Sequence, residues 1–201
     1  MIAIIDYDAG NIKSVEKAMN YLGQEAVITR DRDVILASDK VILPGVGAFG
    51  DAMQKIKEYH LTNVIYDVVE QKKPFLGICL GLQLLFESSE ESKGVAGLGI
   101  LKGDIVRIPA KQGLKIPHMG WNTIQVKEDA TLFRGISKDA YVYFVHSYYL
   151  KAKEIEDVAA TTFYSTEIHA AVEHDQVFAC QFHPEKSGTV GLKILENFVS
   201  L

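Results

Sequence analysis

Residues 75–86 read Phe75-Leu-Gly-Ile-Cys-Leu-Gly-Leu-Gln-Leu-Leu-Phe86. The four residues before Cys79 form an apolar run, which predicts a buried strand, and the leucines after it predict a buried helix. Gly77 and Gly81 flank the cysteine, as a sharp turn from strand to helix requires when neighbouring side chains have no room. The segment therefore predicts an α/β fold in which Cys79 lies on a tight turn.

Short apolar runs alternate with amphipathic segments through the first half of the chain. The sequence predicts strands at 2–5, 26–29, 41–43 and 75–78, and helices at 12–22, 51–59 and 61–71. Strands interleaved with helices form parallel sheets covered on both faces. We therefore expect a doubly wound, mostly parallel sheet with flanking helices, whose ligands bind at the carboxyl ends of the strands. The turns expected at those ends are 6–11, 44–50 and 77–81.

The second half has a different pattern, in which β-segments are separated by turns. These segments are 106–108, 123–127, 141–149, 158–162, 170–173 and 177–182. They predict additional antiparallel strands, and an apolar stripe from Val190 to Val199 predicts a final helix. The chain has 201 residues, with no linker or repeat, and is expected to form a single domain, 1–201.

The composition argues against several classes of function. The formal net charge is -5, and no run of lysine or arginine is present, which speaks against nucleic acid or a membrane surface as the main partner. Two cysteines do not make a disulfide framework, so a reducing compartment is expected. The sequence contains neither an apolar stretch of about 20 residues nor a signal peptide. We expect a cytoplasmic protein that acts on a small polar substrate.

A histidine and a carboxylate occur together in the segment His183-Pro-Glu185. In an extended segment, side chains at i and i+2 share a face, so Glu185 can hold the His183 imidazole in the orientation that a general base needs. Taken alone, the Cys79 turn fits a buried structural cysteine equally well, and 183–185 fits a surface turn better. Together they favour a cysteine–histidine–glutamate hydrolytic triad.

A glycine-rich turn, Pro44-Gly-Val-Gly-Ala-Phe-Gly50, follows the predicted strand at 41–43. Acyl transfer needs N–H donors for the oxyanion that forms, and glycines let backbone amides approach a ligand closely. We expect the amides of Val46, Gly47 and Leu80 to be these donors. The turn lacks the lysine and hydroxyl residue of a phosphate-binding loop. Because the other histidines have no metal-ligand spacing, neither a metal nor a cofactor is expected.

These motifs resemble those of the class I, triad-type glutamine amidotransferases, over nearly the whole chain. The matching segments are Asp6-Tyr7 with Gly10-Asn11, Pro44 to Gly50, Gly77 to Gln83, Pro117-His-Met-Gly-Trp-Asn122, Phe144-Val-His-Ser-Tyr148 and Gln181-Phe-His-Pro-Glu-Lys-Ser187. The triad motifs specify the superfamily alone. The segments 44–50 and 117–122 narrow the resemblance to the amidotransferase subunits of imidazole glycerol phosphate synthases.

The resemblance implies a reaction in histidine biosynthesis. Cys79 would attack the side-chain amide of glutamine, His183 would transfer the protons, and Glu185 would orient His183. Glutamate and ammonia would form through a γ-glutamyl thioester. The residues that would bind glutamine are Gly47, Gln83, Glu91, Ser147 and Tyr148.

The resemblance also implies a partner. Ammonia would pass to a cyclase subunit, a (β/α)8 barrel in this family, which forms a heterodimer with the amidotransferase and makes imidazole glycerol phosphate and aminoimidazole carboxamide ribotide. Four residues match family positions at or near that interface: Asn11, Trp121, Tyr143 and Lys186. From the sequence alone, Trp121 also fits a core aromatic, Asn11 a helix N-cap, Tyr143 an inward strand residue and Lys186 a solvated charge.

Asp8 and Ser165 occupy positions where many family members have glycine, so the backbone at both can differ from the usual one. Two alternative functions stay open. One is the glutaminase subunit of another synthase, such as pyridoxal phosphate synthase. The other is a noncatalytic domain in which Cys79 senses redox state. Gln83 and the His183–Glu185 pair argue against the second alternative, because a sensor needs no substrate-binding residues.

Overall fold

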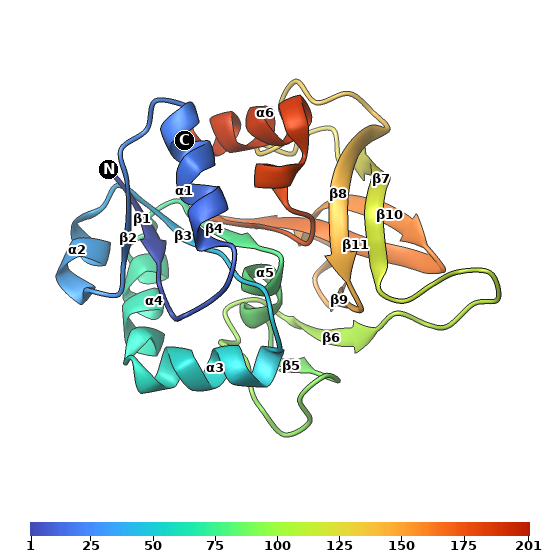
Figure 1. The fold of residues 1–201 in the computed structure, drawn as a ribbon, viewed down its shortest axis with the longest axis horizontal. Coiled ribbons are helices and arrows are strands. Elements are labelled where there is room, and N and C mark those ends of the chain that lie inside the picture. Colours follow the sequence, from blue (N-terminus) through green and yellow to red (C-terminus); the bar gives the residue numbers. More distant parts are fainter.

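The apolar runs of the first half form the parallel part of a 12-stranded sheet in the computed structural model, which describes residues 1–201 (Figure 1). The parallel strands, in spatial order, are β2 (Ala26–Thr29), β1 (Ile2–Ile5), β3 (Lys40–Leu43), β4 (Phe75–Ile78) and β12 (Val177–Cys180). Neighbouring strands in this group all pair in parallel. Because β12 comes from the far end of the chain, the sheet brings the residues after β12 beside the residues after β4.

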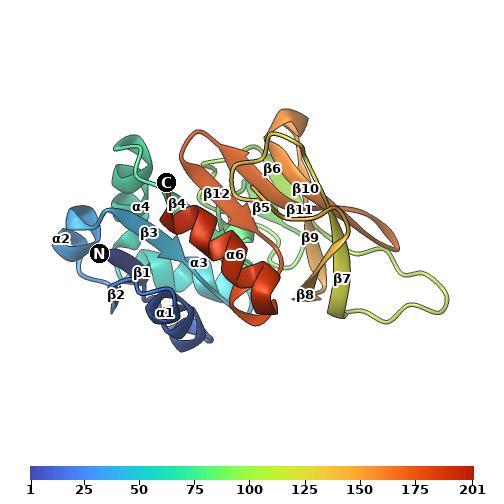
Figure 2. The same ribbon diagram turned by 90° about the horizontal axis from the view of Figure 1, so that it is seen from above.

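Helices cover both faces of the parallel strands. They are α1 (Ile12–Tyr21), α2 (Arg32–Ala37), α3 (Phe49–Glu58), α4 (Leu61–Glu70), α5 (Leu80–Leu84) and α6 (Gly188–Val199). Side chains alternate along β1, so that Ile2 and Ile4 belong to the core cluster with α1 and α6, whereas Ala3 and Ile5 belong to the cluster with α3 and α4. Figure 2 shows these two pairs of helices on opposite faces of the parallel strands. The sequence did not predict α2, whose first turn is capped by the Asp31 carboxylate.

The second half of the chain extends the sheet with antiparallel strands. These are β6 (Gly103–Arg107), β7 (His118–Val126), β8 (Ala140–His146), β9 (Tyr148–Ala152), β10 (Val158–Tyr164) and β11 (Thr166–His174), together with the two-residue β5 (Ser88–Ser89). Two short 3-10 turns are η1 (Ile155–Asp157) and η2 (Pro184–Lys186). The segment 141–149, predicted as one strand, is divided at Ser147, because β8 pairs with β7 and β9 pairs with β6 and β11.

The predicted fold class is confirmed: helices flank a sheet whose first half is parallel and whose second half adds antiparallel strands. Antiparallel pairs form a larger part of the sheet than the sequence suggested. The single-domain organisation of residues 1–201 stays a prediction, although one continuous sheet connects both halves. None of the helices combines the length and apolar character that a membrane-spanning helix requires.

The carboxyl ends of β1, β3, β4 and β12 meet at one edge of the sheet. The residues that follow these strands are the loop 6–11, the glycine-rich turn 44–48, Cys79, and the segment from Gln181 to His183. Parallel strands place the turns after them on the same side, which is where open α/β sheets bind ligands. The motifs from distant parts of the sequence therefore converge at this edge.

Candidate active site

Cys79 lies on the predicted turn between β4 and α5. Its backbone has φ 55° and ψ -106°, a conformation that a non-glycine residue rarely adopts. A Cβ on Gly81 would lie 1.8 Å from the Leu43 carbonyl oxygen, and a Cβ on Gly77 would lie 2.9 Å from the Gly81 backbone. The flanking glycines thus allow the turn to pack against β3. The Cys79 side chain is largely buried but borders a cavity.

His183 and Glu185 lie directly behind Cys79. The His183 Nδ1 and the Glu185 Oε1 are 2.8 Å apart, and both side chains are buried. The extended segment predicted here is wrong, because 184–186 form the 3-10 turn η2 and His183 precedes it. The two side chains still meet, since Ser187 Oγ donates to the His183 carbonyl and closes the turn.

The imidazole of His183 carries an unusual charge state. Burial acts to lower its pKa, but interactions with Cys79 and Glu185 raise the pKa by more than burial lowers it, to about 9. His183 therefore holds a proton at neutral pH. Its Nε2 is buried without a hydrogen-bond partner, and so is the Glu185 Oε2. A protonated imidazole next to a cysteine stabilises the thiolate, which is the nucleophilic form.

Asn11 contacts the proposed triad. Its Nδ2 donates to Glu185 Oε1 at 2.5 Å, and its side chain makes no capping bond to α1. Asn11 is therefore the N-cap residue of α1 by position, but its side chain bonds to Glu185 and does not cap the helix. Asn11 adopts φ 68°, and this left-handed conformation turns the loop after β1 toward η2. Glu185 Oε1 thus accepts hydrogen bonds from both Asn11 and His183.

A cavity of about 340 Å³ opens beside Cys79. Eight of the residues predicted for the site line it: Val46, Gly47, Cys79, Leu80, Gln83, Glu91, Ser147 and Tyr148. Pro117, Val145 and His146 complete the wall. The cavity joins the glycine-rich turn, the Cys79 turn and the junction between β8 and β9. Its size suits a small ligand, and Gln83, Glu91 and Ser147 supply polar groups on a wall that is otherwise largely apolar.

The predicted oxyanion donors are only partly available. The Leu80 N–H donates to the Gly45 carbonyl at 3.2 Å, so this amide is already engaged. Gly47 has φ 115°, a conformation that favours glycine, and lines the cavity with Val46. Below the turn, the buried Tyr7 hydroxyl donates to the Pro44 carbonyl at 2.7 Å. The turn 44–47 must rearrange before the Leu80 amide can receive an oxyanion.

Gln83 and Glu91 lie in the cavity wall, and hydrogen bonds within the protein fix both side chains. Gln83 Nε2 donates to the Tyr148 carbonyl at 3.2 Å and to Gln181 Oε1 at 3.0 Å. Glu91 Oε2 accepts a hydrogen bond from the Phe49 N–H at 2.8 Å, which fixes the carboxylate at the start of α3. Both side chains are therefore positioned by the protein before any ligand enters.

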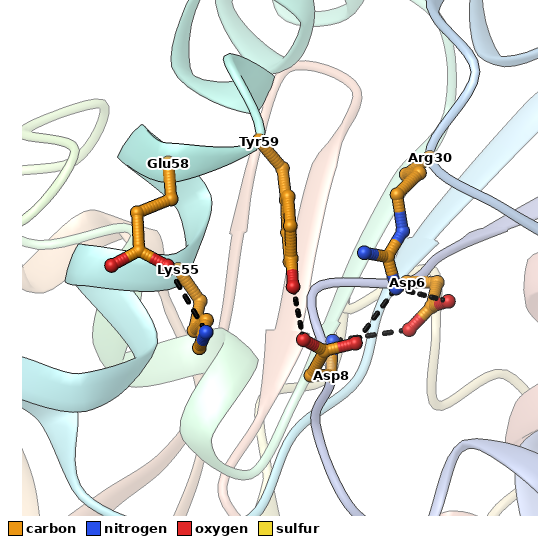
Figure 3. Close-up of polar contacts among 6 residues, drawn as sticks. All are labelled: Asp6, Asp8, Arg30, Lys55, Glu58 and Tyr59. Atoms are coloured by element: carbon orange, nitrogen blue, oxygen red, sulfur yellow. Dashed lines mark hydrogen bonds and ion pairs between the residues drawn. The ribbon is translucent and has the colours of Figure 1, made fainter.

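The loop after β1 is held by an ion-pair cluster at the molecular surface (Figure 3). Arg30 Nη2 donates to Asp6 and to Asp8, each at 2.7 Å, and its guanidinium stacks 4.0 Å over the Tyr59 ring. Tyr59 also donates to Asp8, and the hydrogen bonds from Tyr59 and Arg30 lower the pKa of Asp8. Asp8 has φ 64°, and Ser165 has φ 65°. At both positions the backbone adopts the conformation that glycine favours.

The other residues predicted for the interface lie on β7, β8 and η2. Trp121 is 55% exposed and lies opposite Tyr143 in the β7–β8 register. The Tyr143 carbonyl accepts a hydrogen bond from the His183 N–H at 2.9 Å. Lys186 is exposed on η2. The core alternative for Trp121 is wrong, and the exposed side chains of Met119 and Tyr141 extend the same face of the hairpin.

Some site residues received no role from the sequence. Gln181 is fully buried between Cys79 and Gln83. In the sequence, Gln181 could have been noticed as the one polar residue in the otherwise apolar run 177–182, two positions before His183. His118 and His146 form a buried pair, with Nδ1 of the first 3.0 Å from Nε2 of the second. The two histidines are 28 positions apart in the sequence, so no local pattern signals their contact.

Comparisons with known proteins identify the family of this chain. The family model described as "Glutamine amidotransferase class-I" matches residues 3–201. The chain is 50% identical to the imidazole glycerol phosphate synthase subunit HisH of Methanocaldococcus jannaschii, with 100% of both chains covered. It is 52% identical to the subunit HisH of Caldanaerobacter subterraneus subsp. tengcongensis, covering 98% of this chain and 97% of the other.

Solved structures support the fold. A crystal structure of a glutamine amidotransferase superposes with a TM-score of 0.77 at 19% identity, covering 100% of this chain and 98% of the other. The structure of PurLQS from Thermotoga maritima gives a TM-score of 0.77 at 19% identity, covering 99% of this chain and 97% of the other. At this level of identity, the likeness concerns the fold alone.

Proposed function

The chain belongs to the class-I glutamine amidotransferases and, within them, to the HisH subunits of imidazole glycerol phosphate synthase, and from this premise we propose that Cys79, His183 and Glu185 hydrolyse glutamine. As a family member, it is a glutamine amidotransferase that supplies ammonia for histidine biosynthesis. One observation carries the assignment of residues: Cys79 borders the cavity while the His183–Glu185 pair, 2.8 Å apart, is buried behind it.

In the first half of the proposed reaction, the Cys79 thiolate attacks the side-chain carbonyl carbon of glutamine and forms a tetrahedral oxyanion. The intermediate collapses when the carbon–nitrogen bond breaks and protonated His183 gives its proton to the departing nitrogen. Ammonia leaves, and a γ-glutamyl thioester stays on Cys79. His183 suits this step because its pKa, raised to about 9, keeps it protonated at neutral pH.

In the second half, neutral His183 takes a proton from water as the oxygen attacks the thioester. The second tetrahedral intermediate expels the thiolate, and glutamate is released. Glu185 keeps the imidazole oriented and balances its charge through both halves. We assign glutamine binding to Gln83, Glu91, Ser147, Tyr148 and Gly47, which line the cavity. The amides of Val46, Gly47 and Leu80 would stabilise the oxyanion after the turn rearranges.

We further propose that ammonia passes to a cyclase subunit, a (β/α)8 barrel, in a heterodimer. The exposed aromatic side chains of Trp121 and Tyr141 support this interface, because aromatic residues are enriched where proteins associate. Tyr143 joins this face to His183, and Asn11 joins Glu185 to the neighbouring loop. Lys186 lies on the same turn as Glu185. We also propose that the protein acts in the cytoplasm.

Replacing the nucleophile tests the division of labour. The Cys79→Ala variant, in complex with the cyclase, should lose glutamine-dependent synthesis by at least about a thousandfold, because no thioester can form. Ammonium-dependent synthesis by the barrel subunit should persist at the wild-type rate. Both activities are measured from formation of imidazole glycerol phosphate. Retained glutamine-dependent synthesis, or loss of both activities in an assembled complex, would contradict the assignment.

A second experiment tests the engaged Leu80 amide. Glutamate release by the isolated chain should be slow, because its Leu80 N–H donates to Gly45 and the oxyanion site is incomplete. Addition of the cyclase with its ribulose phosphate substrate should raise the turnover by at least about tenfold if the partner shifts the turn to the open arrangement. Equal turnover with and without the loaded partner would contradict this. Binding to the pyridoxal phosphate synthase partner instead would favour the alternative acceptor.

A further inference from the structure

Gln181 connects the nucleophile to the wall of the cavity. Its side chain is 0% exposed, immediately after β12, and Cys79 follows the adjacent parallel strand β4. Gln181 Nε2 donates to Cys79 Sγ at 3.7 Å. Gln181 Oε1 accepts a hydrogen bond from Gln83 Nε2 at 3.0 Å. The amide therefore bridges the attacking atom and a residue proposed to bind glutamine.

The orientation of both amides follows from one acceptor, the Tyr148 carbonyl. A backbone carbonyl cannot donate, so the group of Gln83 that lies 3.2 Å from it must be the NH2 group. The second hydrogen of that NH2 group points to Gln181, which must then present its oxygen. The NH2 group of Gln181 consequently faces the Cys79 sulfur. The arrangement places a hydrogen-bond donor on the nucleophile and leaves Gln83 Oε1 as the amide atom available to a ligand.

From this geometry we propose that Gln181 is a positioning residue that stabilises the Cys79 thiolate by hydrogen bonding and orients Gln83 toward the substrate. The proposal rests on the proposed function, since the reaction needs the thiolate. A donor to the charged form of an acid favours that form. Because the amide is neutral, it does so at every working pH, in addition to the charge of His183.

The other groups near Cys79 do not duplicate this role. Tyr7 is buried and its hydroxyl donates to the Pro44 carbonyl. Burial raises the pKa of the Cys180 thiol well above its usual value, and its Sγ donates to the Phe182 carbonyl. His183 faces Cys79 from the position just before η2, with Glu185 beyond it. Gln181 is the neutral donor among these groups.

The test measures the reactivity of the sulfur without glutamine or a partner. The full chain is treated with iodoacetamide from pH 5 to pH 10, and alkylation at Cys79 is followed by mass spectrometry. Cys180 is fully buried, so the label should report on Cys79, and Cys79→Ala verifies this. The compared variants are Gln181→Met and Gln181→Glu, with Gln176→Met as the matched control at the turn before β12. Thermal unfolding of each variant is measured in parallel.

For Gln181→Met, the midpoint of the pH–rate profile should move up by about one pH unit, as expected when a charged sulfur loses a hydrogen bond. Below the midpoint the rate should fall about threefold, because the thiolate fraction drops about tenfold while a more basic sulfur is intrinsically more reactive. For Gln181→Glu the midpoint should move up further, since a carboxylate repels the thiolate. Gln176→Met should match the wild type.

The glutamate variant keeps the size of the side chain and covers the case in which Gln181→Met does not fold. Wild-type profiles in the folded Gln181 variants would overturn the proposal, and so would an equal shift in Gln176→Met. The two proposals fail separately. A wild-type complex that releases no glutamate would refute the proposed function, whereas the alkylation profile depends only on the chain itself.

Discussion

At the scale of single residues, Glu185 shows how a buried carboxylate is positioned. Its Oε1 accepts hydrogen bonds from Asn11 and His183, while its Oε2 has no partner. Hydrogen bonds that involve charged groups are the strong ones, and they restrict the carboxylate more than packing alone does. From the sequence, Asn11 was expected at a partner interface or at a helix N-cap. Its contact with Glu185 gives it a second role, in the orientation of the triad.

Replacing Asn11 by glycine tests this role. Glycine accepts the positive φ of Asn11, so the loop should keep its shape while Glu185 loses one donor. We expect kcat for glutamate release by the isolated chain to fall about tenfold. KM should change little, because Asn11 does not line the cavity where glutamine would bind. Ser165→Gly, a matched change at a positive φ outside the cavity, should leave kcat unaltered. An unchanged kcat in Asn11→Gly would show that Glu185 needs no help from this loop.

At the scale of elements, the turn from β4 to α5 depends on contact with β3. The backbone at Gly81 touches the Leu43 carbonyl so closely that a Cβ would lie 1.8 Å from that oxygen. A side chain there would push α5 away from β3, and α5 carries Gln83. The position of Gln83 in the cavity wall therefore requires glycine at position 81.

Gly81→Ala should destabilise the protein by about 3 kcal/mol, at the upper end of what overpacking costs, because backbone atoms on both sides must move. Urea denaturation measures the change. Gly23→Ala is the matched control, since Gly23 has a positive φ but nothing within 4 Å of an added Cβ. The control should cost about 1 kcal/mol, from backbone conformation alone. Equal losses in the two variants would mean that the contact with β3 is easily relieved.

At the scale of the whole molecule, two buried histidines connect the antiparallel half to the cavity. His146 Nδ1 donates to the Tyr148 carbonyl at 2.8 Å, so its Nε2 must accept the hydrogen bond from His118 Nδ1 at 3.0 Å. Asn122 Nδ2 donates to His118 Nε2 at 3.3 Å, so each ring has one nitrogen that accepts a hydrogen bond and both rings are neutral. Burial lowers the pKa of His118 to about 4, and burial lowers that of His146 to about 3.

Acid should consequently destabilise the fold well before the carboxylates titrate. The unfolded chain binds a proton at each histidine near pH 6.5, whereas the folded chain does not until about pH 4 or 3. The contribution of these two histidines to stability is therefore full above pH 6.5 and falls as the pH drops below it. At pH 5, His146 alone should remove about 2 kcal/mol of the free energy of unfolding. Urea midpoints at pH 7, 6 and 5 measure this loss.

The exposed His174 provides the control for that slope. The hydrogen bond to Asp157 raises the pKa of His174, so this residue acts in the opposite direction, and as an exposed pair it contributes little. His174→Gln should keep the acid slope. A constant urea midpoint between pH 7 and pH 5 would mean that the buried pair is protonated in the folded protein.

Much of the architecture could be predicted because it depends on short-range patterns. The strands at 26–29 and 75–78 and the helix ahead of Gly23 follow from apolar periodicity and glycine positions, which act locally. The break at Ser147 could not be predicted. It arises because β8 and β9 pair with different strands, and pairing partners are not encoded within the segment itself.

The sequence by itself determined the fold class and the family, and it is the source of the proposal that Cys79, His183 and Glu185 react, since each motif depends on residue types at fixed local spacing. Only the tertiary structure decided what surrounds them. Asn11 meets Glu185, Gln181 meets Cys79, and the Gly45 carbonyl engages the Leu80 amide. These contacts join the ends of different strands, and they exist because the sheet brings those ends together.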